Sequence, residues 1–126
     1  MKKVIETTEA PAPIGPYNQA TLVDKTLYAS GQIALDPKTM ELVNEDIQAE
    51  TTQVMKNLSA VLKAAGMDFT NVIKATIYLA DMGDFDLVNE VYGGYFNNDD
   101  APARETVQVA QLPKNVRVEI SVIAIL

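Results

Sequence analysis

The chain has 126 residues, of which 48% are hydrophobic, and its 10 basic and 17 acidic side chains give a formal net charge of −7. This apolar content is enough for one core, so we expect a single domain spanning residues 1–126. Binding to nucleic acid requires clustered basic side chains, and the acidic balance argues against such a partner.

The sequence contains neither cysteine nor histidine. The usual zinc and copper sites are therefore not expected, and proton transfer would fall to Asp, Glu, Lys or Tyr. No apolar run approaches the roughly 20 residues that cross a bilayer, so we expect no membrane partner. The N-terminus lacks the apolar core of a signal peptide, and no disulfide can form. These features predict a cytoplasmic protein without a metal.

The first part of the chain is predicted to form a strand, a rigid loop and a hairpin. A short strand is expected at Lys3–Glu6, and the three prolines between Ala10 and Tyr17 then restrict φ and hold Tyr17 in a set place. Strands at Gln19–Val23 and Thr26–Ala34 flank the turn Asp24-Lys25.

The second strand of that hairpin is interrupted by Ser30-Gly31-Gln32. A glycine inside a strand marks either a bulge or a close approach of the backbone to another group, such as a ligand. The sequence leaves both interpretations open.

The middle of the chain contains two predicted helices around one strand. A helix is expected from Asp46 to Ala65 with Gly66 as its stop, and Val72–Leu79 reads as a strand whose apolar face contains Ile73 and the alternate residues after it. Asp84 is a candidate N-cap for a second helix, which carries an aromatic stripe that we assign to the core and ends near Gly93-Gly94.

The C-terminal stretch is predicted to be a hairpin of Arg104–Ala110 and Val116–Leu126, paired Val107 to Val118 and Val109 to Val116. This register puts Arg104, Thr106 and Glu119 on one face, with Arg104 diagonal to Glu119 at roughly 7 Å. The strand around Glu119 is apolar on both faces, so burial should raise the pKa of its carboxyl unless Arg104 compensates. The pair is either a structural ion pair or an anion clamp beside a proton-transfer group.

The predicted order β-β-β-α-β-α-β-β indicates an α+β fold, a mixed sheet with both helices on one face. The other face would carry polar residues among apolar ones. Those expected there are Arg104, Thr106, Glu119, Thr76 and Tyr78 among Val72, Ile123 and Ile125. This mixture predicts a subunit interface with polar clefts between protomers.

Several short motifs together resemble the Rid/YjgF family of reactive-intermediate deaminases. They are Ile14-Gly15-Pro16-Tyr17, Ser30-Gly31-Gln32-Ile33, Phe85 with Asn89, Pro102-Ala103-Arg104, Leu112-Pro113 and Val118-Glu119-Ile120, and the resemblance runs from Ile5 to Ile125. It implies a chorismate-mutase-like fold and a homotrimer with sites between subunits. The implied reaction is hydrolysis of 2-iminobutanoate and 2-iminopropanoate to 2-keto acids and ammonia, without a cofactor.

The same resemblance implies roles for individual residues. Arg104 matches the arginine that binds the substrate carboxylate, Glu119 the residue that holds or activates water, and Tyr17 a tyrosine of the site. Ser30 and Gly31 match a segment lining the pocket, and Asn89 matches a polar contact. Thr106 stands where many members have Cys and is expected to contribute through its backbone, which excludes thiol chemistry but not hydrolysis.

Two other functions remain alternatives. The Arg104 clamp would also suit a non-catalytic protein that binds or senses a small carboxylate such as 2-ketobutyrate. Ribonuclease activity or inhibition of translation has been attached to relatives of the family, but the acidic charge and the missing histidines make it the least favoured.

Overall fold

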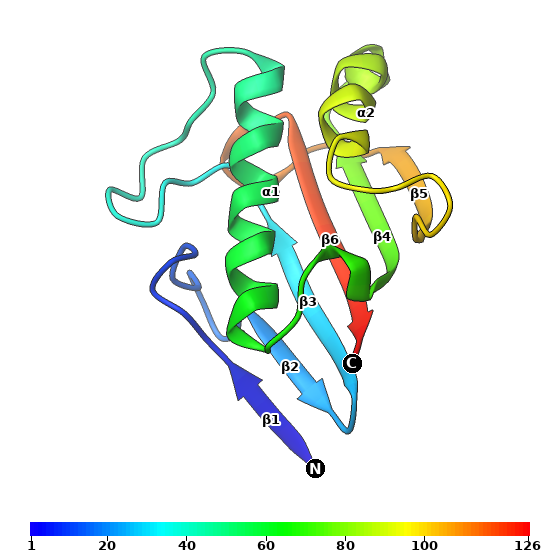
Figure 1. Ribbon diagram of the computed structural model, residues 1–126. Coiled ribbons are helices and arrows are strands. Elements are labelled where there is room, and N and C mark those ends of the chain that lie inside the picture. Colours follow the sequence, from blue (N-terminus) through cyan, green and yellow to red (C-terminus); the bar gives the residue numbers. More distant parts are fainter.

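A computed structural model describes all 126 residues, and in it six strands form one sheet. The strands are β1 (Lys2–Ile5), β2 (Ala20–Val23), β3 (Thr26–Gln32), β4 (Val72–Leu79), β5 (Ala103–Gln108) and β6 (Val118–Ile125). Their order in space is β1-β2-β3-β6-β4-β5 (Figure 1). The helices α1 (Ile47–Ala64) and α2 (Phe85–Gly93) cover one face of this sheet (Figure 1). The predicted α+β class, a mixed sheet with two helices on one face, is confirmed.

The predicted N-terminal hairpin is confirmed. Strands β2 and β3 pair antiparallel across the turn Asp24-Lys25, where Asp24 takes a positive φ of 53°. The pairing of β3 with β6 shifts between Ala29 and Gln32, so Ser30 and Gly31 lie in a bulge. A bulge of this kind re-aims the backbone locally.

Helix α1 begins and ends where its capping residues predict. The Asp46 carboxylate accepts a hydrogen bond from the backbone N–H of Ala49 at 2.7 Å, and Gly66 takes the left-handed φ of +73° just beyond the last turn. Helix α2 has its N-cap at Asp84 as predicted, but the Asp84 side chain makes no capping hydrogen bond. The preceding 3₁₀ turn, Met82–Asp84, is capped instead by Asp81.

One facing assignment in β4 was wrong. The register against β6 shifts between Val72 and Lys74, which leaves Val72 buried and Ile73 47% exposed. From Ala75 onward the predicted apolar face is confirmed, because Ala75, Ile77 and Leu79 are all buried under the helices.

The predicted C-terminal hairpin is wrong. Strand β4 lies between β5 and β6, pairing parallel with β5 and antiparallel with β6. The connection from β4 to β5 runs through α2, as parallel neighbours require. Val107 therefore lies beside Tyr78 rather than Val118, and Glu119 pairs with Tyr78 rather than Thr106.

The core lies between the sheet and the two helices, and the opposite face of the sheet is open. Alternate residues of β6 from Val118 to Ala124 are buried under α1. On the open face Tyr28, Val107 and Ile125 are 49%, 41% and 41% exposed. Neither helix combines the length and the apolar character needed to cross a membrane.

Candidate functional site

Four of the predicted site residues line one cavity of about 550 Å³. These four are Tyr17, Ser30, Gly31 and Glu119, and the wall is completed by the proline-rich loop after β1 and by the turn before β6. These residues come from three segments that are far apart in the sequence. The β3 bulge places Ser30 and Gly31 beside the Glu119 side chain of β6. The cavity is large enough for a small organic acid.

Gly31 is required by the close approach of the Glu119 side chain. A β-carbon built on Gly31 would lie 2.8 Å from Cδ and 2.9 Å from Cγ of Glu119, inside van der Waals contact. Of the two interpretations left open by the sequence, both the bulge and a close approach are present, and the approaching group is a side chain of the protein.

The Glu119 carboxyl has no ion-pair or hydrogen-bond partner within the chain. Burial of this group raises its pKa, because desolvation disfavours the charged form. The expected pKa rise is confirmed, and Arg104 does not compensate for it. A carboxylate with a raised pKa is a stronger base than an exposed one and is suited to take a proton from water.

Tyr17 is held at the mouth of the cavity by the loop that the prolines restrict. Its hydroxyl oxygen accepts a hydrogen bond from the backbone N–H of Ile14 at 3.3 Å. The buried amide of Gln19 anchors the loop by donating to the carbonyls of Thr7, Ala10 and Pro11. Sequence reasoning placed Gln19 in the hairpin strand and missed its role in the loop, whereas the structure places it just before β2.

The remaining predicted residues lie beside α2. Arg104 donates a hydrogen bond to the Asn89 side-chain oxygen at 2.6 Å, and its guanidinium lies 5.7 Å from the ring centre of Phe85 and 5.0 Å from that of Tyr92. Phe85, Asn89 and Tyr92 are spaced i, i+4 and i+7, so α2 presents all three to Arg104. The other guanidinium donors make no hydrogen bond within the chain and are free to bind a carboxylate.

Two buried hydroxyls beside Arg104 lack a partner. They are the hydroxyls of Thr106 and Tyr92. Burial raises the pKa of the Tyr92 phenol, an effect that the nearby Arg104 charge partly offsets. Tyr92 was predicted to be core and is 5% exposed, yet it also lines the cavity of about 400 Å³ that contains Arg104 and Asn89. The regular spacing from Phe85 could have identified it.

The prediction that Arg104 and Glu119 share one face of the sheet is wrong. Arg104 is in register with the buried Ala75 and points to the helix side, whereas Glu119 is in register with Tyr78 on the open side. Thr106 lies on the helix side with Arg104. A single chain therefore carries two separate groups of site residues, one around Glu119 and one around Arg104.

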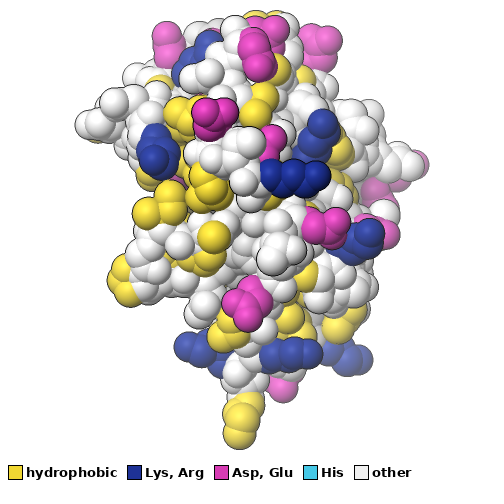
Figure 2. Space-filling model, turned by 90° about the vertical axis from the view of Figure 1, so that its left-hand side faces the viewer, with side chains coloured by type: hydrophobic (Ala, Val, Ile, Leu, Met, Phe, Trp, Pro, Cys, Tyr) yellow, Lys and Arg dark blue, Asp and Glu magenta, His cyan; other side chains and the backbone are white.

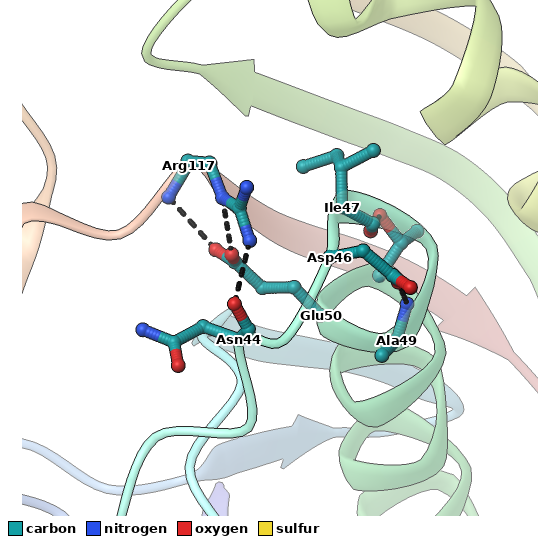
Figure 3. Close-up of polar contacts among 7 residues, drawn as sticks. Asn44, Asp46, Ile47, Ala49, Glu50 and Arg117 are labelled. Atoms are coloured by element: carbon teal, nitrogen blue, oxygen red, sulfur yellow. Dashed lines mark hydrogen bonds and ion pairs between the residues drawn. The ribbon is translucent and has the colours of Figure 1, made fainter.

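The start of β6 is fixed by an ion pair between the buried Glu50 and the partly exposed Arg117, which sequence reasoning did not find (Figure 3). The Glu50 carboxylate, 1% exposed, accepts from the backbone N–H and from Nε of Arg117, both at 2.8 Å. Arg117 also donates to the Asn44 carbonyl at 2.9 Å. These contacts tie helix α1 to the residue two positions before Glu119, so they set where that carboxylate lies.

Comparison with known proteins identifies the family. The family model described as Endoribonuclease L-PSP, which represents the Rid/YjgF proteins, matches residues 7–126. The chain belongs to the Rid/YjgF family. A human relative of this Rid/YjgF protein, named 2-iminobutanoate/2-iminopropanoate deaminase, is 52% identical over 125 residues, covering 99% of this chain and 90% of its own length.

Solved structures of Rid/YjgF proteins share the fold. YyfA from Yersinia pestis, described as a member of the conserved Rid family, is 47% identical with a TM-score of 0.96, and the match covers 100% of both chains. TdcF from E. coli, solved with bound serine, is 40% identical with a TM-score of 0.92 and 98% coverage of each chain.

The contact between Gly31 and Glu119 gives a direct test of the Glu119 group. In Gly31→Ala the new methyl would displace the end of a flexible side chain, so we expect little change in melting temperature but an imine hydrolysis rate at least about tenfold lower. The matched control is Gly94→Ala, whose methyl would lie 3.4 Å from the nearest atom, the Val91 carbonyl oxygen. Activity of Gly31→Ala equal to that of the control would contradict the assignment.

Proposed function

We propose that this protein hydrolyses short 2-imino acids, 2-iminobutanoate and 2-iminopropanoate, to 2-keto acids and ammonia without a cofactor. The observation that carries the proposal is the unpaired, desolvated Glu119 carboxyl in a cavity with Tyr17, Ser30 and Gly31. The names of the deaminase relatives support it. The cavity offers a base, space for water and room for a small acid.

Glu119 and Arg104 have different roles in the proposed reaction. Arg104 offers two parallel donors to the substrate carboxylate and fixes the direction of the C=N carbon. Glu119 takes one proton from a water molecule as its oxygen attacks that carbon, and passes this proton to the imine nitrogen. The hydroxyl of the tetrahedral intermediate then gives its proton to Glu119, which passes it to the same nitrogen, so that the C–N bond breaks, ammonia leaves and the C=O bond forms. One water is consumed, one C=N bond is broken and one C=O bond is formed, so no electron acceptor is needed.

We further propose that the protein is a homotrimer in which the Arg104 group of one subunit faces the Glu119 group of its neighbour. Two observations support this arrangement. The two groups lie in separate cavities of the same chain, so neither is complete alone. The open face of the sheet exposes apolar residues that a neighbouring subunit would cover.

The proposed activity is tested by supplying the imine enzymatically. Threonine and threonine dehydratase generate 2-iminobutanoate, and semicarbazide traps whatever is not hydrolysed. Wild-type protein should lower the yield of semicarbazone. For Arg104→Ala we expect a rate of imine hydrolysis at least about tenfold below that of wild type, because the charge-assisted hydrogen bonds to the substrate carboxylate are lost. Lys56→Ala, which removes an exposed cation of α1, should behave as wild type. An undiminished adduct with wild-type protein would overturn the assignment.

The two alternatives make different predictions. A sensor of small carboxylates would bind 2-ketobutyrate but leave the imine intact, and Glu119→Ala would change neither property. RNA binding calls for a basic surface. The side of the molecule in Figure 2 intersperses Lys and Arg with Asp and Glu, and the net charge of −7 disfavours RNA. Salt-dependent binding of RNA to this protein would favour the ribonuclease or translation-inhibitor alternative.

A further inference from the structure

Lys114 lies at the Glu119 cavity, and the predicted roles do not account for it. It is the one basic residue among those lining the cavity, as Glu119 is the one acidic residue. The two ion pairs of the chain, Lys74–Glu105 and Arg117–Glu50, involve neither of them.

The backbone around Lys114 is fixed in an unusual conformation. Lys114 and Asn115 take left-handed φ values of 55° and 54°, which side chains other than Gly adopt at a cost. The Gln111 side chain donates to Asn115 Oδ1 at 2.6 Å. Leu112 and Val116, both buried, anchor the two ends of the turn. The turn therefore fixes the Lys114 backbone beside the cavity, and the exposed Lys114 side chain is part of the cavity wall.

A positive charge at this cavity would offset the electrostatic repulsion of an anionic substrate. A 2-imino acid carries a carboxylate at neutral pH, and a protein with a net charge of −7 repels it at long range. Glu119, the only acidic residue that lines the cavity, adds to that repulsion at the place where water would attack the substrate. A cation at the same cavity opposes both effects.

We propose that Lys114 is a specificity-determining residue that draws the carboxylate of an anionic substrate into the Glu119 cavity, before Arg104 of a neighbouring subunit binds it. The inference rests on the proposed function. Its effect falls on capture of the substrate, so it is distinct from the orienting role of Arg104 and from the proton transfer at Glu119.

The test compares Lys114→Gln with Lys114→Arg and with the control Lys56→Gln, which changes the net charge equally from the exposed face of α1. At low ionic strength we expect Lys114→Gln to lower kcat/KM for 2-iminobutanoate about three- to tenfold with kcat nearly unchanged. Lys114→Arg and Lys56→Gln should stay within about twofold of wild type. At about 1 M salt, where the Debye length is about 3 Å, the deficit of Lys114→Gln should nearly vanish.

Binding of 2-ketobutyrate, measured by calorimetry on the same proteins, separates this inference from the proposed function. If wild-type protein binds the keto acid but hydrolyses no imine, the activity is wrong, and a salt-dependent weakening in Lys114→Gln still supports the role of Lys114. If wild type hydrolyses the imine and Lys114→Gln matches it at low salt, the Lys114 role is wrong. A deficit of equal size at every salt concentration also overturns it, because a loss of local structure would not be screened.

Discussion

Glu119→Ala and Arg104→Ala should each lower imine hydrolysis at least about tenfold, and oligomers assembled from both variants together should regain about a quarter of wild-type activity. The expectation follows from the separation of the two groups on one chain, since Arg104 points to the helix side of the sheet and Glu119 to the open side. If each site combines Glu119 of one subunit with Arg104 of the next, about one neighbouring pair in four in a random one-to-one mixture retains both residues.

The measurement is imine hydrolysis by co-expressed or co-refolded mixtures of the two variants. A matched pair of variants from the same group, Glu119→Ala with Gly31→Ala, should not complement, because both residues line the same cavity. If the mixture of Glu119→Ala with Arg104→Ala stays inactive although it assembles, the site lies within one chain. In that case the proposed shared site is wrong.

Arg117→Met should lower the free energy of unfolding by about 3–5 kcal/mol, because it leaves a buried carboxylate without its cation. Glu50 is 1% exposed and holds Nε and the backbone N–H of Arg117 at 2.8 Å each (Figure 3). The backbone N–H remains in the variant, but the compensating charge does not. Urea or thermal unfolding measures the loss.

The matched control for this ion pair is the exposed pair Lys74–Glu105, whose side chains are 37% and 60% exposed. Breaking it with Glu105→Gln should cost about 0–1 kcal/mol, since water solvates both groups. If the two variants unfold within about 1 kcal/mol of each other, the Glu50 carboxylate is not the buried anchor described here.

The contrast between the two hairpins shows where sequence reasoning succeeds. The turn at Asp24-Lys25 joins two strands directly, and the predicted pairing of β2 with β3 is observed. Strands β5 and β6 are also consecutive in the sequence, and both are predicted from their period-two alternation. In the sheet, however, β4 lies between them. Period-two alternation indicates that a segment is a strand and which residues share a face, but it carries no information about the neighbouring strand.

The site divides in the same way. The short motifs predicted one site that also includes Arg104, Asn89 and Thr106, and of its residues Tyr17, Ser30, Gly31 and Glu119 line one cavity in the structure. Arg104 was placed with them through the wrong hairpin. Lys114, Tyr92 and Gln19 were not predicted, because their roles depend on which segment packs beside them.

The sequence by itself determined the order and bounds of most elements and the family, because local conformational preferences, capping residues and short motifs are properties of neighbouring residues. Only the tertiary structure decided that Arg104 and Glu119 face opposite sides of the sheet. The physical reason is that strand neighbours are chosen by which apolar faces can be buried together. Here helix α2 carries the chain across to the far side of β4 before β5 begins.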